Sequence, residues 1–166
     1  MKLTITAAIG VQYVRRLRKH VQGAARILKA PCSQLSIALV NDKQMSKLHR
    51  QFMQIDGPTD VLTFPLEFDS RKRGTSGEIV ICVPEARRRA KEMKVAVQNE
   101  LLLYAVHGML HLSGFDDRTR RGFRTMHEME DRILRELGVG AVFAPHGMSK
   151  GRHEGTKAHR HGGGDE

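Results

Sequence analysis

The clearest structural signal in this chain is a long apolar segment, which runs Leu101-Leu102-Leu103-Tyr104-Ala105-Val106-His107-Gly108-Met109-Leu110-His111-Leu112. Apolar side chains occupy most of its positions, and Gly114 stands where a helix would end. The pattern predicts a helix over about 96–112. Because a helix that is apolar on all sides has to be covered by other elements, we expect it in the interior of the fold.

The segments around this helix predict strands and further helices. Strand patterns occupy 3–9, 35–40, 60–66 and 77–83. Helical patterns occupy 11–29, 43–53, 84–94 and 118–137. The second of these helices is expected to bury Met45, Leu48 and Phe52, and the last to bury Phe123, Met126, Ile133 and Leu137. Pro65 lacks a backbone donor, so the third strand is expected at an edge or a strand end.

The net charge of +10 is spread over the part of the chain that is expected to fold. Residues 144–166 hold four basic and three acidic residues, a net +1, so +9 belongs to the rest. Such a basic domain attracts polyanions, and nucleic acid is favoured over a charge that serves solubility alone. We expect one domain over 1–143 and a disordered, His-, Gly- and Lys-rich tail over 144–166.

The sequence also bears on the compartment. It has no uninterrupted apolar run of about 18 residues, so no membrane span is expected, and its first residues do not resemble a secretory signal. Cys32 and Cys82 have no metal-binding spacing, and Cys82 is expected to be a small buried hydrophobe. This cysteine usage predicts a cytoplasmic protein.

His107 and His111 are four residues apart on the expected central helix, so both imidazoles project from one face. Gly114 permits a left-handed turn that brings Asp116 or Asp117 near them. Two imidazoles and one carboxylate can hold zinc and leave a position open, as catalytic zinc sites do. The alternative is a hydrogen-bonded histidine pair without metal. The apolar surroundings favour the metal, because imidazoles there need partners.

The spacing is close to the H-E-x-x-H-x-x-G-x-x-H pattern of metzincin peptidases, with two differences. Gly108 replaces the Glu that such peptidases use as general base, which argues against peptide hydrolysis. Asp117 stands in place of the third His.

Four motifs together resemble the YbeY family of endoribonucleases. In chain order they are similar to the family's P-T-D-V-L-S-F-P at 58–65, G-D-I-x-I at 77–81, H-G-x-L-H-L-x-G-[FY]-D at 107–116 and M-x-x-x-E at Met126 and Glu130. Their order and spacing agree from about residue 35 to 137, which is most of the chain that is expected to fold.

The resemblance implies an α+β fold with a small mixed four-stranded sheet and about five helices, the central one carrying both histidines. It implies a metal-dependent endoribonuclease, specific for single strands, that acts in 16S ribosomal RNA 3′-end maturation and ribosome quality control. The implied partners are ribosomal RNA and the pre-30S or 70S ribosome, with no membrane and no small-molecule cofactor. One Zn²⁺ per chain would be held by His107, His111 and Asp117, which would act in catalysis through a metal-bound water.

Two positions depart from the family pattern. Asp117 stands where the family usually has His, and a carboxylate is also a zinc ligand, although it would favour a harder ion such as Mn²⁺. Met53 stands where the family has an Arg that would suit a phosphate. The expected substitute is Arg71 or Arg73 from the loop over 67–76.

RNA contacts are expected to be mainly electrostatic, because the chain has only two Tyr, six Phe and no Trp. If helices 84–94 and 11–29 flank the cleft, they would hold the RNA backbone, and the candidate RNA-binding residues are Arg87, Arg88, Lys91, Arg71 and Arg73. The base would be a metal hydroxide, or else Glu78 or Asp60, and the attacking group is water or the RNA 2′-hydroxyl.

Two other functions stay open. One is a metallohydrolase acting on a small molecule or a peptide, against which the charge and Gly108 count. The other is a non-catalytic RNA- or ribosome-binding factor that keeps its metal for folding, which Met53 favours.

Overall fold

The computed structural model describes residues 1–29, 32–67 and 75–140. Its elements are β1 (Lys2–Ala7), a 3₁₀ turn (Val11–Tyr13), α1 (Val14–Leu28), β2 (Cys32–Val40), α2 (Asp42–Met53), β3 (Val61–Glu67), β4 (Thr75–Cys82), α3 (Val83–Met93), α4 (Val97–Leu112) and α5 (Arg120–Glu136). The order and kind of the expected elements are confirmed, with small shifts at their ends. The expected domain end at 143, the tail over 144–166 and both loop arginines, Arg71 and Arg73, lie outside the described residues.

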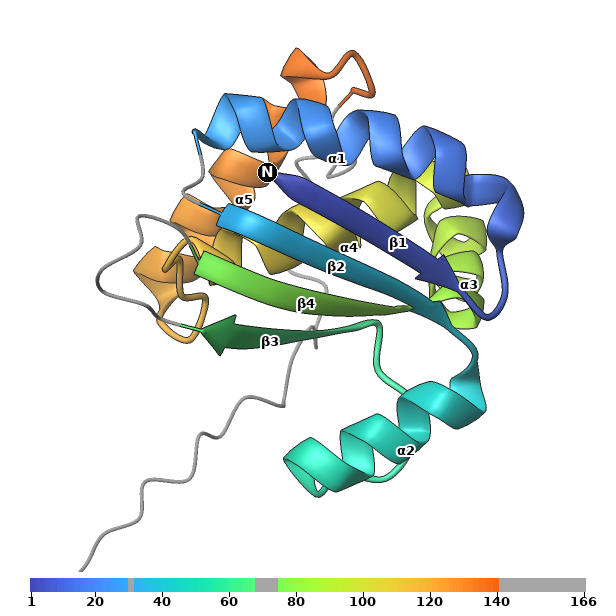
Figure 1. The fold of residues 1–166 in the computed structure, drawn as a ribbon. Coiled ribbons are helices and arrows are strands. Elements are labelled where there is room, and N and C mark those ends of the chain that lie inside the picture. Colours follow the sequence, from blue (N-terminus) through green and yellow to red (C-terminus); the bar gives the residue numbers. More distant parts are fainter. Residues whose placement is uncertain (30–31, 68–74, 141–166) are drawn as a thin grey trace, which may run out of the picture.

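The four strands form one mixed sheet in the order β1-β2-β4-β3 (Figure 1). β1 pairs with β2, and β2 with β4, in parallel, whereas β3 runs antiparallel to β4. β3 is an edge strand, as Pro65 predicted, because a residue without an N–H is tolerated where no neighbour needs the bond. The expected α+β fold, with a four-stranded mixed sheet and five α-helices, is confirmed for the described residues.

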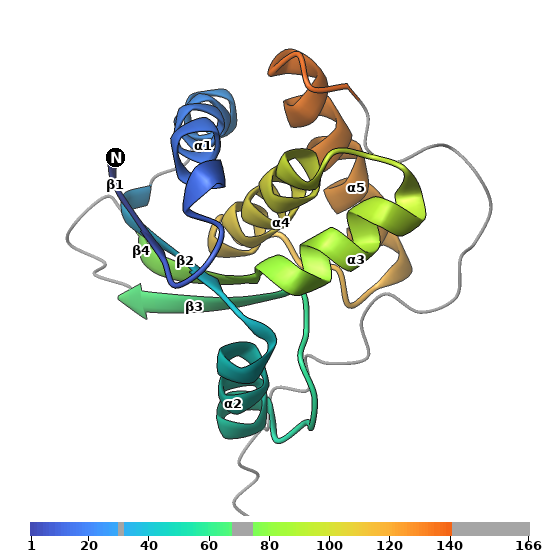
Figure 2. The same ribbon diagram turned by 90° about the vertical axis from the view of Figure 1, so that its right-hand side faces the viewer.

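α4 is the central helix of the fold and packs against the sheet, on the same side as α1 and α5 (Figure 2). Ten of its sixteen residues are buried. Two glycines let α4 approach β4 closely: a Cβ at Gly77 would overlap Leu112, and one at Gly108 would lie 2.8 Å from Ile79 Cδ1. Position 108 therefore faces the core and cannot present a side chain to the face that carries the histidines. None of the described helices is long and apolar enough to cross a bilayer.

We expect Gly108→Ala to destabilise the protein by about 1–3 kcal/mol, the usual cost of an extra methyl group in a packed core. Alanine's better helix propensity, worth about 1 kcal/mol, acts in the opposite direction. Thermal unfolding followed by circular dichroism measures the difference, with Gln22→Ala on the exposed side of α1 as the control. If Gly108→Ala raised the melting temperature, the close approach of α4 to Ile79 would be contradicted.

Two aromatic residues that were expected to be buried are exposed. Phe52 is 53% exposed: it lies near the end of α2, which packs on the other side of the sheet, and its ring contacts Phe64 of the edge strand. Phe123 is 42% exposed, because it contacts His127 beside a pocket rather than the core. The helical period was right in both cases, but it does not show where the covering surface ends.

Cys82 is fully buried, as expected of a small hydrophobe. Burial raises the pKa of its thiol to about 12, so the thiol stays protonated at neutral pH.

Candidate metal centre

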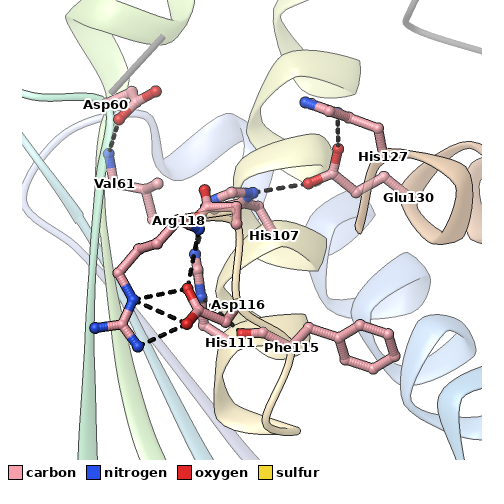
Figure 3. Close-up of polar contacts among 10 residues, drawn as sticks. Asp60, Val61, His107, His111, Phe115, Asp116, Arg118, His127 and Glu130 are labelled. Atoms are coloured by element: carbon pink, nitrogen blue, oxygen red, sulfur yellow. Dashed lines mark hydrogen bonds and ion pairs between the residues drawn. The ribbon is translucent and has the colours of Figure 1, made fainter. Parts of the chain in front are cut away.

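Hydrogen bonds donated by the Nδ1 atoms hold the two imidazoles of α4 in one orientation. His107 Nδ1–H donates to Glu130 Oε1 at 2.7 Å, and His111 Nδ1–H donates to the Phe115 carbonyl at 3.1 Å (Figure 3). In their neutral forms both rings therefore have an Nε2 lone pair available. The two Nε2 atoms are 3.0 Å apart, so they face the same small volume.

The turn after α4 brings one carboxylate to this volume. Gly114 has a φ of +91°, the left-handed conformation that was expected of it. Asp117 Oδ2 lies 3.8 Å from the Nε2 atoms of both His107 and His111. Zinc bonds of about 2.1 Å at tetrahedral angles separate ligand atoms by roughly 3.4 Å. The three donor atoms, all within 4.8 Å of one another, therefore fit one zinc ion.

Asp116, the other carboxylate that the sequence left open, has a different partner. It is exposed and is bound by the side chain of Arg118, with a shortest N–O distance of 2.6 Å. These hydrogen bonds from Arg118 lower the pKa of Asp116 to about 2. A Cβ at Gly122 would overlap the backbone oxygen of Asp116, so the turn lies directly against the start of α5. This packing leaves Asp117, and not Asp116, beside the histidines.

Behind the histidines lies a buried carboxylate, Glu130 of α5, which is only 1% exposed. Its Oε1 accepts from His107, and its Oε2 accepts from His127 Nδ1–H at 2.8 Å. Burial raises the pKa of Glu130, but the hydrogen bonds and charges of the two histidines outweigh this and lower it overall. A carboxylate behind a metal-binding imidazole fixes the ring and increases its basicity. Sequence reasoning noted Glu130 as part of a motif without giving it this contact, and it missed His127 altogether.

We expect the affinity for zinc to fall as the pH is lowered. Burial lowers the pKa of His107, but the hydrogen bond and charge of Glu130 and the charges of Asp117 and Asp60 raise it overall. Since zinc needs the neutral ring, affinity should decrease by about tenfold per pH unit below that raised pKa. The decrease should thus begin above about pH 6.5, the ordinary histidine value. Competition with a chromogenic chelator measures it, and a constant affinity between about pH 8 and pH 5 would contradict the expectation.

His107 and Asp117 line a pocket between α4, α5 and the start of β3. Its lining residues are Asp60, Val61, Leu103, Tyr104, His107, Asp117, Phe123, Met126, His127 and Glu130. Asp60, one of the two carboxylates considered as a general base, therefore lines the same pocket as His107 and Asp117. Glu78, the other, is not: Gly77 and Ile79 face α4, so Glu78 points to the opposite side of the sheet.

A family model described as Endoribonuclease YbeY matches residues 5–138 of this chain. The chain belongs to the YbeY endoribonuclease family. A YbeY endoribonuclease from Anaeromyxobacter dehalogenans is 35% identical over 156 residues, which are 93% of this chain and 78% of the relative. One from Carboxydothermus hydrogenoformans is 40% identical over 105 residues, which are 63% of this chain and 73% of the relative.

The fold is also similar to a solved structure, the solution structure of TM1509 from Thermotoga maritima. The TM-score is 0.53 at 23% identity, with 89% of this chain and 99% of that chain covered. At this identity the likeness concerns the fold alone.

Of the basic residues that were expected to bind RNA in this YbeY-family protein, Arg87, Arg88 and Lys91 lie in the described part of the chain, and none of them lines the pocket. Arg87 and Lys91 are exposed on α3, and Arg88 is bound by Asp42 and Glu85, with N–O distances of 2.7 and 2.6 Å. No described residue of α3 or α1 lines the pocket, and α1 lies along β1, at the sheet edge opposite β3 (Figure 1). No contact of the described residues tests RNA binding by these two helices, so it stays a prediction.

Met53, at the position of the family Arg, is half-buried and packs against the small apolar cluster of Val40, Met45, Leu62, Val80 and Cys82. The nearby Arg50 does not replace that Arg, because it pairs with Asp56 at 2.7 Å and does not line the pocket.

Proposed function

We propose that this protein is a zinc-dependent endoribonuclease that cleaves single-stranded RNA and acts in 16S ribosomal RNA 3′-end maturation and ribosome quality control. Membership of the YbeY endoribonuclease family supports the activity. The observation that carries the proposal is the convergence of His107 Nε2, His111 Nε2 and Asp117 Oδ2, two of whose residues, His107 and Asp117, line a pocket. Ribosomal RNA and the pre-30S or 70S ribosome are the proposed partners, which places the protein in the cytoplasm.

His107, His111 and Asp117 are the proposed ligands of one Zn²⁺ per chain. When bound, zinc would supply Lewis-acid polarisation of a phosphate oxygen and a lowered pKa for water. The contribution of the chain is to keep both Nε2 atoms unprotonated and directed inward, through the bonds of the Nδ1 atoms to Glu130 and the Phe115 carbonyl. Asp60 is the carboxylate of the pocket wall that is placed to accept a proton from the attacking water or 2′-hydroxyl.

Cleavage assays on the purified, zinc-loaded protein test the activity. The substrates are a single-stranded RNA, its duplex, a single-stranded DNA of the same sequence, a peptide and an ester. We expect cleavage of single-stranded RNA only, and hydrolysis of the peptide or the ester alone would replace the proposal with a metallohydrolase of another kind.

The cellular role is tested by sequencing 16S 3′ ends in a deletion strain. Complementation with the wild-type gene should restore mature ends, and complementation with His111→Ala should not. If immature ends did not accumulate in the deletion strain, the role in 3′-end maturation would be wrong.

A non-catalytic RNA- or ribosome-binding factor is the second candidate, and Met53 is the observation that favours it. An apolar side chain occupies the position at which the family places a guanidinium, and neither Arg50 nor any other described arginine lines the pocket. Complementation by His107→Ala, with unchanged RNA affinity, would establish this candidate in place of the enzyme.

A further inference from the structure

One wall of the pocket carries an exposed aromatic ring next to the proposed metal ligands. Phe123 is 42% exposed and lines the same pocket as His107 and Asp117. Its ring is held edge to face against His127, with centroids 4.1 Å apart and an interplanar angle of 75°. A ring that is fixed on one side and open to water on the other is suited to stack on an unpaired base. Phe52 is exposed too, but it lies at the far end of α2 and not at this pocket.

Arginines adjacent to this ring in the sequence have no counterion among the described residues. The segment 118–124 reads Arg-Thr-Arg-Arg-Gly-Phe-Arg, and of its four arginines only Arg118 forms an ion pair with a described residue, Asp116. Arg120 and Arg124 are exposed and make no ion pair with any described residue. On α3, Arg88 and Arg89 pair with acidic neighbours, whereas Arg87 makes no ion pair with any described residue.

Helical geometry places these side chains in one stripe. Arg120, Phe123, Arg124 and His127 occupy positions i, i+3, i+4 and i+7 of α5, so they are neighbours on one side of the helix. His127 and Phe123 line the pocket, and the two arginines, which do not line it, lie next to them on the helix surface. Guanidinium groups without a counterion beside an exposed ring match alternating phosphates and bases, and a duplex would keep its bases out of reach.

We propose that this stripe of α5 is the RNA-binding surface of the protein, in which Phe123 stacks on a base and Arg120 and Arg124 contact the flanking phosphates. The inference rests on the proposed function, because it makes single-stranded RNA the occupant of the pocket. It assigns the RNA path to α5, and not to α1 or α3, where the sequence alone placed it.

Fluorescence anisotropy with a labelled single-stranded oligoribonucleotide tests the surface. Equilibrium binding is measured in the full-length chain with His111→Ala, so that the RNA stays intact, and KM and kcat are measured without that substitution. We expect Phe123→Ala to weaken binding by about tenfold, the effect of removing one stacked base, and Phe123→Trp to keep the affinity. The KM for RNA should rise in Phe123→Ala and stay near the wild-type value in Phe123→Trp, while kcat changes little in both variants.

The matched control for charge is a pair of exposed residues on α1, Arg15 and Lys19, which have the same i, i+4 spacing as Arg120 and Arg124. The double variant Arg120→Glu/Arg124→Glu should weaken binding far more than Arg15→Glu/Lys19→Glu. It should also reduce the slope of log affinity against log salt by about 0.7 for each phosphate that the variant no longer neutralises. If the two double variants lost equal affinity for RNA, or if Phe123→Ala kept the affinity of the unsubstituted surface, the proposal that α5 binds RNA would be overturned.

The outcomes separate this inference from the proposed function. If the wild-type chain cleaves RNA and the α5 variants keep its KM, the proposed nuclease activity is supported and the proposed RNA-binding stripe of α5 is wrong. If the wild-type chain binds RNA through the α5 stripe without cleaving it, the surface holds and the nuclease is wrong. Failure of the wild-type chain to bind single-stranded RNA would contradict both.

Discussion

Replacing His111 by alanine is expected to reduce kcat/KM for single-stranded RNA by about a thousandfold or more, because several kcal/mol of transition-state stabilisation leave with the metal. The structural cost should be small, because the His111 side chain is 28% exposed and its Nδ1–H bonds only a carbonyl of the adjacent turn, that of Phe115. The variant should therefore fold and bind RNA while it loses zinc.

The measurement is single-turnover cleavage of a labelled RNA together with the zinc content of the same preparation. The control is His20→Ala on α1, where the ring bonds the local Arg16 carbonyl. That variant should match the wild type in both assays. If His111→Ala kept full activity, the three-ligand site would have no part in the reaction.

Replacing Glu130 by glutamine is expected to weaken zinc binding by about 10–100-fold, the usual effect of losing the carboxylate behind a metal-binding imidazole. The amide keeps the size of the side chain but carries no charge. It can accept from only one of the two rings through its oxygen, while its NH₂ group would face the other ring's N–H. His107 is then free to turn its Nε2 away from the metal.

The change also acts through the pKa of His107. The charge of Glu130 is one of the causes that raise this pKa, so Glu130→Gln should move the loss of zinc to lower pH while it weakens binding at neutral pH. Isothermal titration at several pH values measures both effects. Glu128→Gln, an exposed position on the same helix, is the control. Equal zinc affinities of Glu130→Gln and wild type would show that Glu130 does not support the ligand.

Zinc-free stability should have a related pH window. The lowered pKa of Glu130 means that its contribution is present above the ordinary carboxyl pKa and is lost as the pH falls through the folded value. The raised pKa of His107 means that its contribution is present below the ordinary histidine pKa and is lost as the pH rises through the folded value. The pair therefore stabilises the zinc-free protein most in the mildly acidic range between the two.

The fold was largely predictable because its elements carry strong local signals. The apolar α4 could only be interior, and Pro65 marked β3 as an edge strand. Phe52 and Phe123 were placed wrongly because the helical period shows which side of a helix is apolar, but not how far the covering surface extends. The end of a sheet and the mouth of a pocket are tertiary features.

The candidate site was predictable where its members are close in the sequence. The four-residue spacing placed both imidazoles together, and Gly114 allowed the turn that returns Asp117 to them. The bond from His107 to Glu130 spans 23 residues and depends on how α5 packs against α4, so no local pattern could show it. The ion pair of Arg88 with Asp42, which is 46 residues away, could not be predicted for the same reason.

The zinc content of three full-length preparations, wild type, Asp117→Asn and Asp116→Asn, tests the metal centre most directly. Both substitutions remove one negative charge at adjacent positions, but only Asp117 lies 3.8 Å from both imidazoles. Elemental analysis should find one zinc per chain in the wild type and in Asp116→Asn, and far less than one in Asp117→Asn. Stoichiometric zinc in Asp117→Asn, or its loss from Asp116→Asn instead, would contradict the arrangement of ligands proposed for this protein.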